Sequence, residues 1–225
     1  MGNKIPFPSA ILFDFDGVVV NSFKVHSTAW KKAFEKIFNK KIPDFPTKTH
    51  AGKAPILIAE YFCNAVGQVH LAQNLYDLKA ELLHKSLQAP ELLPGIKEMT
   101  SFLKENGIQY GIASNATKQF IKNSIVQLDL NFETYTGVED YTNPKPHPEA
   151  YLKLAEKLEV SREFIKKTWV FEDSITGIKA AKDAGMIPVG ILTQQAEKDL
   201  IKAGSQIQFP TVKEGFYYLS KLKKK

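Results

Sequence analysis

The chain contains almost no cysteine: Cys63 is the only one among 225 residues. A single thiol cannot close a disulfide within the chain, which excludes the small secreted proteins that depend on such bridges. A lone cysteine among apolar neighbours usually behaves as a small buried hydrophobe, so we do not expect a thiol nucleophile. A reducing compartment is the default for such a chain, and we predict a cytoplasmic location.

Long hydrophobic runs are also missing. The most apolar stretch near the amino terminus, residues 10–20, is interrupted by Asp14, Asp16 and Gly17. This pattern is typical neither of a signal peptide nor of a transmembrane helix. We therefore expect no membrane partner.

Zinc-finger spacings and mixed aromatic and basic motifs are absent as well. The net charge of +6 favours anionic partners in general. Much of this positive charge, however, comes from four lysines in the tail 221–225. We expect the partner to be a small phosphorylated metabolite and not a nucleic acid. We also expect the chain to be a monomer or a weak dimer.

The second half of the sequence alternates short apolar segments with helical patterns. Such continuously apolar segments, separated by helices, are typical of a parallel sheet that is covered on both faces. The fold class predicted is α/β, with a doubly wound, mostly parallel sheet. The predicted strands are 109–113, 168–171 and 187–191, and the predicted helices are 96–106, 117–128 and 175–184.

A helical block interrupts this pattern directly after the first strand. Apolar residues at helical spacing predict helices over 22–39, 54–66 and 69–87. The length of the chain fits one large domain that carries an insertion. We therefore predict a core domain of residues 1–20 and 91–225, and a helical domain of residues 21–90.

Polar residues follow the predicted strands where each one ends. Asp14 and Asp16 end the first apolar run, the pair 114–115 (Ser-Asn) follows 109–113, and the pair 172–173 (Glu-Asp) follows 168–171. Ligands bind to open α/β sheets at the carboxyl ends of the strands. Two buried acids are costly unless they are paired, protonated or bound to metal. The sequence therefore predicts a reaction centre at this edge of the sheet.

These segments resemble the four motifs of haloacid dehalogenase-like hydrolases, in the phosphatase branch that carries a helical cap. The first motif is 14–18 (Asp-Phe-Asp-Gly-Val), and Ser114, Lys145 and the pair 172–173 match the second, third and fourth. Four motifs in the expected order are far more specific than any one of them. The resemblance covers nearly the whole chain.

The resemblance implies a Mg²⁺-dependent phosphatase. Asp14 would attack phosphorus and form an aspartyl phosphate, and Asp16 would act as general acid and then as general base. Lys145 and Ser114 would complete the catalytic group, with Asn115 as a weaker candidate for phosphate binding. Mg²⁺ prefers oxygen ligands, and the ligands implied are Asp14, the backbone carbonyl of Asp16, Asp173 and Glu172, the last directly or through water.

Two residues of the helical block concern the choice of substrate. The segment 25–31 around His26 resembles the corresponding segment of β-phosphoglucomutases, where it would reach the acid–base aspartate. Lys53 is a candidate phosphate-facing residue. Those mutases carry a cap arginine where this chain has Pro55, and a lysine lacks the bidentate fork of arginine. We therefore favour a phosphatase acting on a sugar phosphate or a related metabolite, with a phosphosugar mutase as the alternative.

Other function classes fit the sequence less well. Asp16 disfavours the haloalkanoic-acid dehalogenase and phosphonate-cleaving branches, which lack an aspartate at this position. A non-catalytic module that binds anions or nucleic acid is a remote alternative, because a fold does not determine a function. Steep salt dependence of binding would support that module, whereas phosphate release from small esters would support the enzyme.

Overall fold

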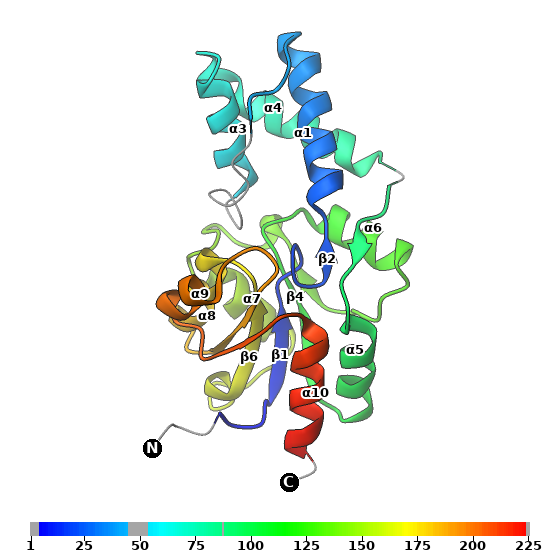
Figure 1. Ribbon diagram of the computed structural model, residues 1–225, viewed down its shortest axis with the longest axis vertical. Coiled ribbons are helices and arrows are strands. Elements are labelled where there is room, and N and C mark those ends of the chain that lie inside the picture. Colours follow the sequence, from blue (N-terminus) through cyan, green and yellow to red (C-terminus); the bar gives the residue numbers. More distant parts are fainter. Residues whose placement is uncertain (1–4, 45–53, 87, 224–225) are drawn as a thin grey trace.

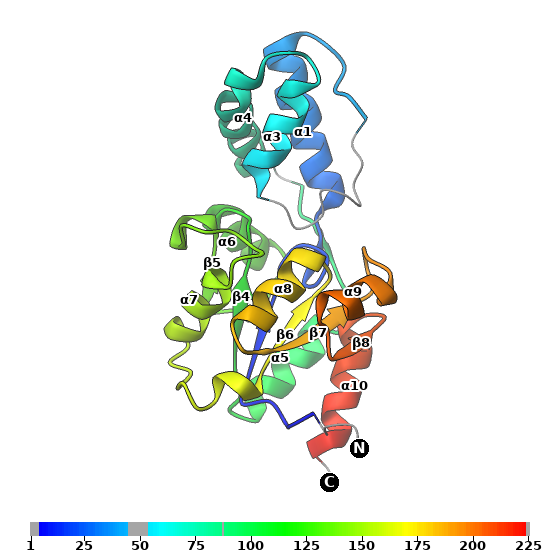
Figure 2. The same cartoon turned by 90° about the vertical axis from the view of Figure 1, so that its left-hand side faces the viewer.

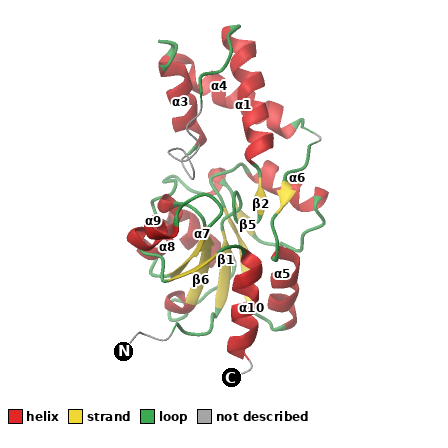
Figure 3. Ribbon diagram, viewed as in Figure 1, coloured by secondary structure: helices red, strands yellow, loops and turns green. Residues whose placement is uncertain are grey.

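A computed structural model describes residues 5–44, 54–86 and 88–223. The chain forms an α/β unit with a separate group of helices above it (Figure 1). Coloured by secondary structure, the strands lie in the α/β unit and at its junction with these helices (Figure 3). No helix among the described residues has the length and apolar character needed to cross a membrane.

The centre of the α/β unit is a six-stranded parallel sheet. Its strand order is β5-β4-β1-β6-β7-β8. Strand β1 lies in the middle, and its last residue, Phe13, is in register with Ile112 of β4 and Phe171 of β6. The strands are β1 (Ala10–Phe13), β4 (Gln109–Ala113), β5 (Tyr135–Thr136), β6 (Thr168–Glu172), β7 (Ile187–Ile191) and β8 (Ile207–Phe209). Their carboxyl ends therefore meet at one edge, which faces the group of helices.

Helices cover both faces of this sheet, because alternate residues of the strands point to opposite sides. Ile11 and Phe13 of β1 belong to the apolar cluster that includes α5 (Ile96–Glu105), α6 (Lys118–Gln127) and α10 (Val212–Lys223). Leu12 points to the other face and packs with α7 (Glu149–Lys157) and α8 (Ile175–Asp183). Figure 2 shows α7 and α8 on this second face, with α9 (Glu197–Ala203) beside α8. Short 3₁₀ turns, η2 (Val138–Asp140) and η3 (Ile165–Lys167), complete the connections.

The separate group of helices has an apolar core of its own. It consists of α1 (Phe23–Phe38), α3 (Pro55–Asn64), the 3₁₀ turn η1 (Val69–Leu71) and α4 (Ala72–His84). Trp30, Phe34, Phe62 and Leu75 are buried together in this core, and Cys63 is buried beside them. Because this core is separate from the sheet, the helical unit can be positioned over the strand ends as one body.

Two short antiparallel strands connect the two units. They are β2 (Val20–Asn21) and β3 (Glu91–Leu92), and the Asn21 side chain donates a hydrogen bond to Glu91 across them. The helical unit leaves the core after β2 and returns through β3. Neither strand is predicted from the sequence, because two residues are too few to show alternation.

Several predicted elements are confirmed at their boundaries. The strands 109–113 and 187–191 have the predicted ends, whereas β6 continues one residue further and includes Glu172. Thr117 is the N-cap of α6 and Ser174 the N-cap of α8, each accepting a backbone hydrogen bond. Gly177 lies so close to Glu172 that a Cβ atom would be 1.6 Å from its Oε1. Helix α8 can therefore approach the end of β6 only with glycine at this position.

Candidate active site

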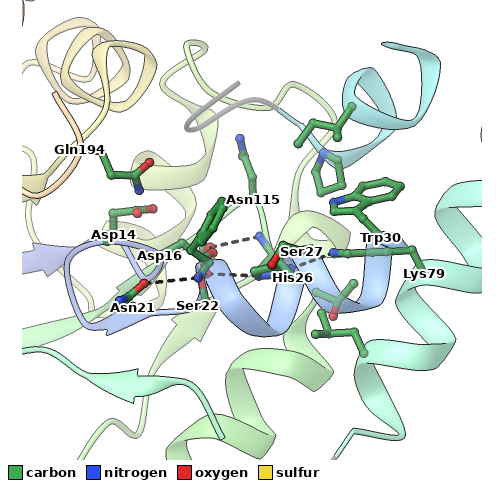
Figure 4. Close-up of a pocket in the computed structure, with 18 of the residues that line it drawn as sticks. Asp14, Asp16, Asn21, Ser22, His26, Ser27, Trp30, Lys79, Asn115 and Gln194 are labelled. Atoms are coloured by element: carbon green, nitrogen blue, oxygen red, sulfur yellow. Dashed lines mark hydrogen bonds and ion pairs between the residues drawn. The ribbon is translucent and has the colours of Figure 1, made fainter. Parts of the chain in front are cut away.

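The polar residues predicted at the strand ends come together in one cleft. Asp14 follows β1, Ser114 and Asn115 follow β4, and Glu172 ends β6. They line a cavity of about 670 Å³ between the sheet edge and the helical unit. Figure 4 shows Asp14, Asp16 and Asn115 on the core side of this cavity, with His26, Trp30 and Lys79 on the helical side.

Lys145 is the buried cation of the cleft. Its ammonium group donates to Asp14 Oδ1 at 2.6 Å, Glu172 Oε1 at 2.9 Å and the carbonyl of Ala113 at 3.0 Å, and lies 2.8 Å from the Tyr151 hydroxyl. Burial acts to lower the pKa of Lys145, but the two carboxylates outweigh it and hold that pKa well above its usual value. Lys145 is therefore a fixed positive charge beside Asp14.

Three buried carboxyl groups lie next to this lysine. Asp14, Glu172 and Asp173 each place an oxygen within 4.8 Å of the other two. Burial raises the pKa of Asp14 to about 8, with a further increase from Glu172, while Lys145 opposes it. Burial and the neighbouring Glu172 and Asp14 also raise the pKa of Asp173 well above its usual value.

Such a group of carboxyl oxygens is suited to a divalent cation. A bound cation would offset both the burial of the carboxylates and their mutual repulsion. Mg²⁺ prefers oxygen ligands and is commonly held by a few carboxylates. The buried acidic group is therefore consistent with the metal site that the sequence indicated. The Asp16 side chain is not part of this group and contacts Ser22, His26 and Ser114 instead.

The raised carboxyl pKa values predict that the fold without metal loses stability as the pH rises. Between the unfolded pKa of 3.8 and the folded value of about 8, the folded state retains a proton on Asp14 that the unfolded chain has released. Above pH 3.8 this difference in protonation costs the metal-free fold stability. Bound Mg²⁺ removes that cost because it stabilises the ionised form of Asp14. We expect the difference in Tm between Mg²⁺ and a chelator to grow from about pH 5 to about pH 8. Potassium at equal ionic strength is the control, and a difference independent of pH would contradict the prediction.

Asp16 lies in a different environment from Asp14. It accepts hydrogen bonds from the Ser22 hydroxyl, from His26 Nε2 at 3.3 Å and from Ser114 Oγ at 3.4 Å. Burial acts to raise the pKa of Asp16, but the hydrogen bonds and nearby positive charge give a net lowering. Ser22 is the N-cap of α1 but makes no side-chain cap bond, because its hydroxyl is directed to Asp16.

Lys79 of α4 completes a chain of contacts that no sequence motif indicates. Its ammonium group lies 2.9 Å from His26 Nδ1 and 5.2 Å from the centre of the Trp30 ring. An ammonium group can only donate, so Nδ1 accepts and the proton of the neutral ring lies on Nε2, facing Asp16. Burial lowers the pKa of Lys79 to about 8, and burial together with Lys79 lowers the pKa of His26.

A weaker signal for Lys79 is present in the sequence. The buried residues of α4 are Ala72, Leu75, Lys79 and Leu83, which follow one helical stripe. A lysine in the middle of an otherwise apolar stripe is rarely buried unless it has a partner. The identity of that partner, 53 residues away in the sequence, is visible only in the fold.

Replacing Lys79 by methionine is expected to change the pH dependence of activity. The positive charge of Lys79 lowers the pKa of both His26 and Asp16, so its removal should raise both values. We expect the limb of the kcat/KM profile that reports Asp16 to move to higher pH, and kcat/KM to fall by up to about 100-fold through misplacement of Asp16. A pH–rate profile measures both effects.

The matched control for this variant is Lys85→Met, which changes an exposed lysine at the C-cap of the same helix. Methionine should pack well at position 79 between Leu75 and Leu83. An unchanged pH profile of kcat/KM in Lys79→Met would show that Lys79 does not act on Asp16.

The loop after β4 is also held by specific contacts. The Tyr141 hydroxyl lies 2.8 Å from the carbonyl oxygen of Ser114 and 2.7 Å from Asn115 Oδ1. Ser114 Oγ accepts a hydrogen bond from the backbone of Ala116. This loop leads into the amino end of α6, where backbone N–H groups and the helix dipole favour an anion.

The structure thus brings together the predicted site residues that lie in its described part. The residues that line the cleft are Asp14, Asp16, His26, Ser114, Asn115, Lys145 and Glu172. Asp173 lies next to Gly17, which also lines the cleft, and close to Asp14 and Glu172. Lys53 lies outside the described residues. Pro55 is the first residue of α3 and lines the cleft from the helical side.

The parallel sheet, its acidic strand ends and the helical unit above them define the class of α/β protein to which the chain belongs. Comparison with known proteins identifies the family within that class. The family model of haloacid dehalogenase-like hydrolases matches residues 11–191. The chain therefore belongs to this family, and it is an enzyme of the hydrolase type that the four motifs indicated.

Individual relatives are similar over most of their length. The chain is 28% identical over 212 residues to a phosphorylated carbohydrates phosphatase of Thermotoga maritima, covering 87% of this chain and 91% of the relative. It is 28% identical over 194 residues to a β-phosphoglucomutase of Bacillus subtilis, covering 81% and 82%. The structure of a β-phosphoglucomutase from Clostridium difficile aligns over 95% of this chain and 96% of that chain, with a TM-score of 0.78 and 22% identity. This last likeness confirms the fold.

Proposed function

We propose that the protein is a Mg²⁺-dependent phosphatase that hydrolyses a small phosphomonoester through an aspartyl phosphate on Asp14. The observation that carries the proposal is the contrast between two acids that are two residues apart. Asp14 contacts Lys145 and lies beside the buried carboxyl groups of Glu172 and Asp173. Asp16 instead contacts Ser22 and His26. Two carboxyl groups in such different environments can perform two different tasks.

Asp14 is the proposed nucleophile. Its carboxylate oxygen forms a bond to phosphorus while the bond from phosphorus to the ester oxygen breaks, which divides the displacement into two steps. Mg²⁺ held by Asp14, Asp173, Glu172 and the backbone carbonyl of Asp16 would keep Asp14 ionised and offset the charge of the phosphoryl oxygens. Lys145 adds a fixed positive charge on the same side.

Asp16 is the proposed acid and base. In the resting site its pKa is low, so it is ionised. A phosphate dianion bound nearby raises that pKa because like charges disfavour ionisation, and Asp16 can then carry a proton to the departing ester oxygen. In the second step Asp16 takes a proton from the water that attacks phosphorus, and Asp14 is released.

Ser114 and Asn115 are the proposed phosphate ligands. Both lie on the loop after β4, and their backbone leads into the amino end of α6. Hydrogen bonds from this loop would hold the transferring phosphoryl group in line with Asp14. Lys53 stays a candidate for substrate binding.

The helical unit is the proposed cap. We propose the division into a core of residues 1–20 and 91–225 and a cap of residues 21–90, with β2 and β3 at the junction. Closure of the cap would exclude bulk water from the reacting phosphoryl group. His26 and Lys79 belong to this unit, so closure would also determine the position of Asp16.

The proposed substrate is a phosphorylated sugar or a related metabolite. Support comes from the Thermotoga relative, which is a phosphatase of phosphorylated carbohydrates. The cleft has room for such a leaving group, since small-molecule sites commonly measure about 300 to 1,000 Å³. Trp30, Ile58 and Tyr76 form an apolar wall of the cleft, against which the apolar face of a sugar ring can pack.

A phosphosugar mutase is the second candidate. The contact between His26 and Asp16 and the similarity to a β-phosphoglucomutase of Bacillus subtilis favour it. The sequence contains one arginine, Arg162, which lies before β6 at the end of the sheet opposite the cleft. The cleft therefore has no arginine for bidentate binding of a second phosphate, and we favour hydrolysis.

A phosphate-release screen tests the proposed function. Purified protein is incubated with Mg²⁺ and a panel of sugar phosphates and nucleotides, with a chelator as control. The panel includes β-glucose 1-phosphate with an assay for glucose 6-phosphate. Mg²⁺-dependent release of phosphate is expected. Formation of glucose 6-phosphate without release would favour the mutase, and no turnover of any ester would overturn the proposal.

A further inference from the structure

A loop outside the four motifs contacts the metal-site carboxyl groups. It follows β7 and contains Thr193 and Gln194, both of which line the cleft. Figure 4 shows Gln194 beside Asp14 at the core side of the cavity. The loop lies at the carboxyl end of the predicted strand 187–191, but no motif singles out Thr193 or Gln194 among its residues.

The Thr193 hydroxyl joins two parts of the site that are distant in sequence. It lies 2.6 Å from the carbonyl oxygen of Gly17 and 3.0 Å from Asp173 Oδ2. Gly17 is the residue after Asp16. This one hydroxyl therefore links the loop after β1, which carries Asp14 and Asp16, to Asp173 of the buried acidic group. The Gln194 side chain also hydrogen-bonds Asp173.

The Asp173 carboxyl group packs directly against the backbone of Gly17. Gly17 has a φ of +89°, and a Cβ atom there would lie 1.8 Å from Asp173 Oδ2. The carboxyl group thus occupies the space that any other residue at position 17 would fill. The Gln194 side chain lies against the same position, with its Nε2 2.6 Å from where that Cβ atom would be. Gly17, Thr193 and Gln194 therefore meet around this one carboxyl group.

This support differs from that of the other two acids. Lys145 holds Asp14 and Glu172 through direct ion pairs of 2.6 and 2.9 Å. Asp173 takes hydrogen bonds from Thr193 and Gln194 instead. Repulsion from Asp14 and Glu172 acts to push an ionised Asp173 out of the group. The hydrogen bonds from Thr193 and Gln194 oppose this repulsion and hold the Asp173 carboxyl group in place for a shared cation.

We propose that Thr193 is a positioning residue of the metal site, which holds Asp173 and the Gly17 carbonyl in the arrangement that binds Mg²⁺. The inference rests on the proposed function for the identity of the ion. Gln194 supports the same carboxyl group from the next position in the loop. Partners that orient a metal ligand typically contribute about 10- to 100-fold to metal affinity or activity.

The test compares Thr193→Val with Thr193→Ser. Valine keeps the shape of threonine but removes the hydroxyl, and serine keeps the hydroxyl. Residue 193 is exposed at the rim of the cleft, so both variants should fold, which circular dichroism and Tm verify. Lys198→Ala, an exposed side chain on the following helix α9, is the matched control.

The primary measurement is Mg²⁺ binding by titration calorimetry without any substrate. Thr193→Val is expected to weaken binding by about tenfold or more, whereas Thr193→Ser and Lys198→Ala keep the native affinity. In a parallel assay of phosphate release, Thr193→Val should raise the Mg²⁺ concentration for half-maximal rate by the same factor. Its kcat at saturating Mg²⁺ should fall much less than its rate at low Mg²⁺.

Each outcome separates the inference from the proposed function. Native Mg²⁺ affinity in Thr193→Val would overturn the inference alone, as would a serine variant as weak as the valine variant. Absence of Mg²⁺ binding in the native chain would overturn both. Mg²⁺ binding with the expected pattern, but without hydrolysis of any ester, would support the role of Thr193 and reject the phosphatase.

Discussion

Replacing Asp14 by asparagine is expected to reduce kcat by about 10⁴-fold or more, the scale on which loss of a catalytic nucleophile acts. Asparagine has the same shape, and its carbonyl oxygen can still accept the hydrogen bond from Lys145. It cannot form the acyl phosphate, because the amide oxygen is a poor nucleophile and carries no charge. Phosphate release and the yield of acid-stable phosphoprotein after a quench measure the loss.

The same variant should fold normally. The ionised form of Asp14 is disfavoured in the fold, as its raised pKa shows. A neutral amide of the same size therefore avoids the cost of burying a negative charge and leaves no cavity. We expect a Tm in chelator at pH 7 no lower than that of the native protein. Asp183→Asn, at the exposed end of α8, is the control. Substantial turnover by Asp14→Asn would reject Asp14 as the nucleophile.

Replacing Asp16 by asparagine is expected to reduce kcat by about 10²- to 10⁴-fold, the usual contribution of general acid–base catalysis. Both formation and breakdown of the aspartyl phosphate should become slower, since one group serves both steps. Asparagine still accepts hydrogen bonds from Ser22 and His26, so the loop geometry should be kept.

The nature of the leaving group distinguishes the two steps in this variant. An aryl phosphate releases a stable phenolate and needs little protonation, whereas an alkyl phosphate depends on the acid. In single-turnover kinetics, Asp16→Asn should slow phosphoenzyme formation far more from the alkyl ester than from the aryl ester. Equal losses on both esters, or a change in KM alone, would contradict the acid role.

Much of the α/β core can be predicted from the sequence because its strands are buried on both faces. Segments 109–113 and 187–191 are continuously apolar and end at polar residues, so their limits are visible locally. The helices are marked by apolar spacing and by cap residues such as Thr117 and Ser174. By contrast, β2 and β3 have two residues each, too few to show any periodicity.

Residues at strand ends can be located from the amino-acid pattern alone, because parallel strands place their carboxyl ends at one edge. This rule correctly brings Asp14, Ser114 and Glu172 together. It does not identify residues that reach the cleft from the helical unit, and it does not say which residue after a strand contacts the site. Lys79 comes from the helical unit and Thr193 from the turn after β7, and neither belongs to a recognisable motif.

The sequence by itself therefore determined the chemical class of this protein: its α/β fold, its family and the groups gathered at the strand ends. These depend on local patterns, because apolar segments, helix caps and the polar residues after strands can each be recognised from residues that are adjacent in the sequence. Only the tertiary structure decided that Asp14 and Asp16 have opposite environments. That contrast depends on Lys145, His26 and Lys79. The effect of such a group on a carboxyl group falls off over a few ångströms and bears no relation to its separation along the chain.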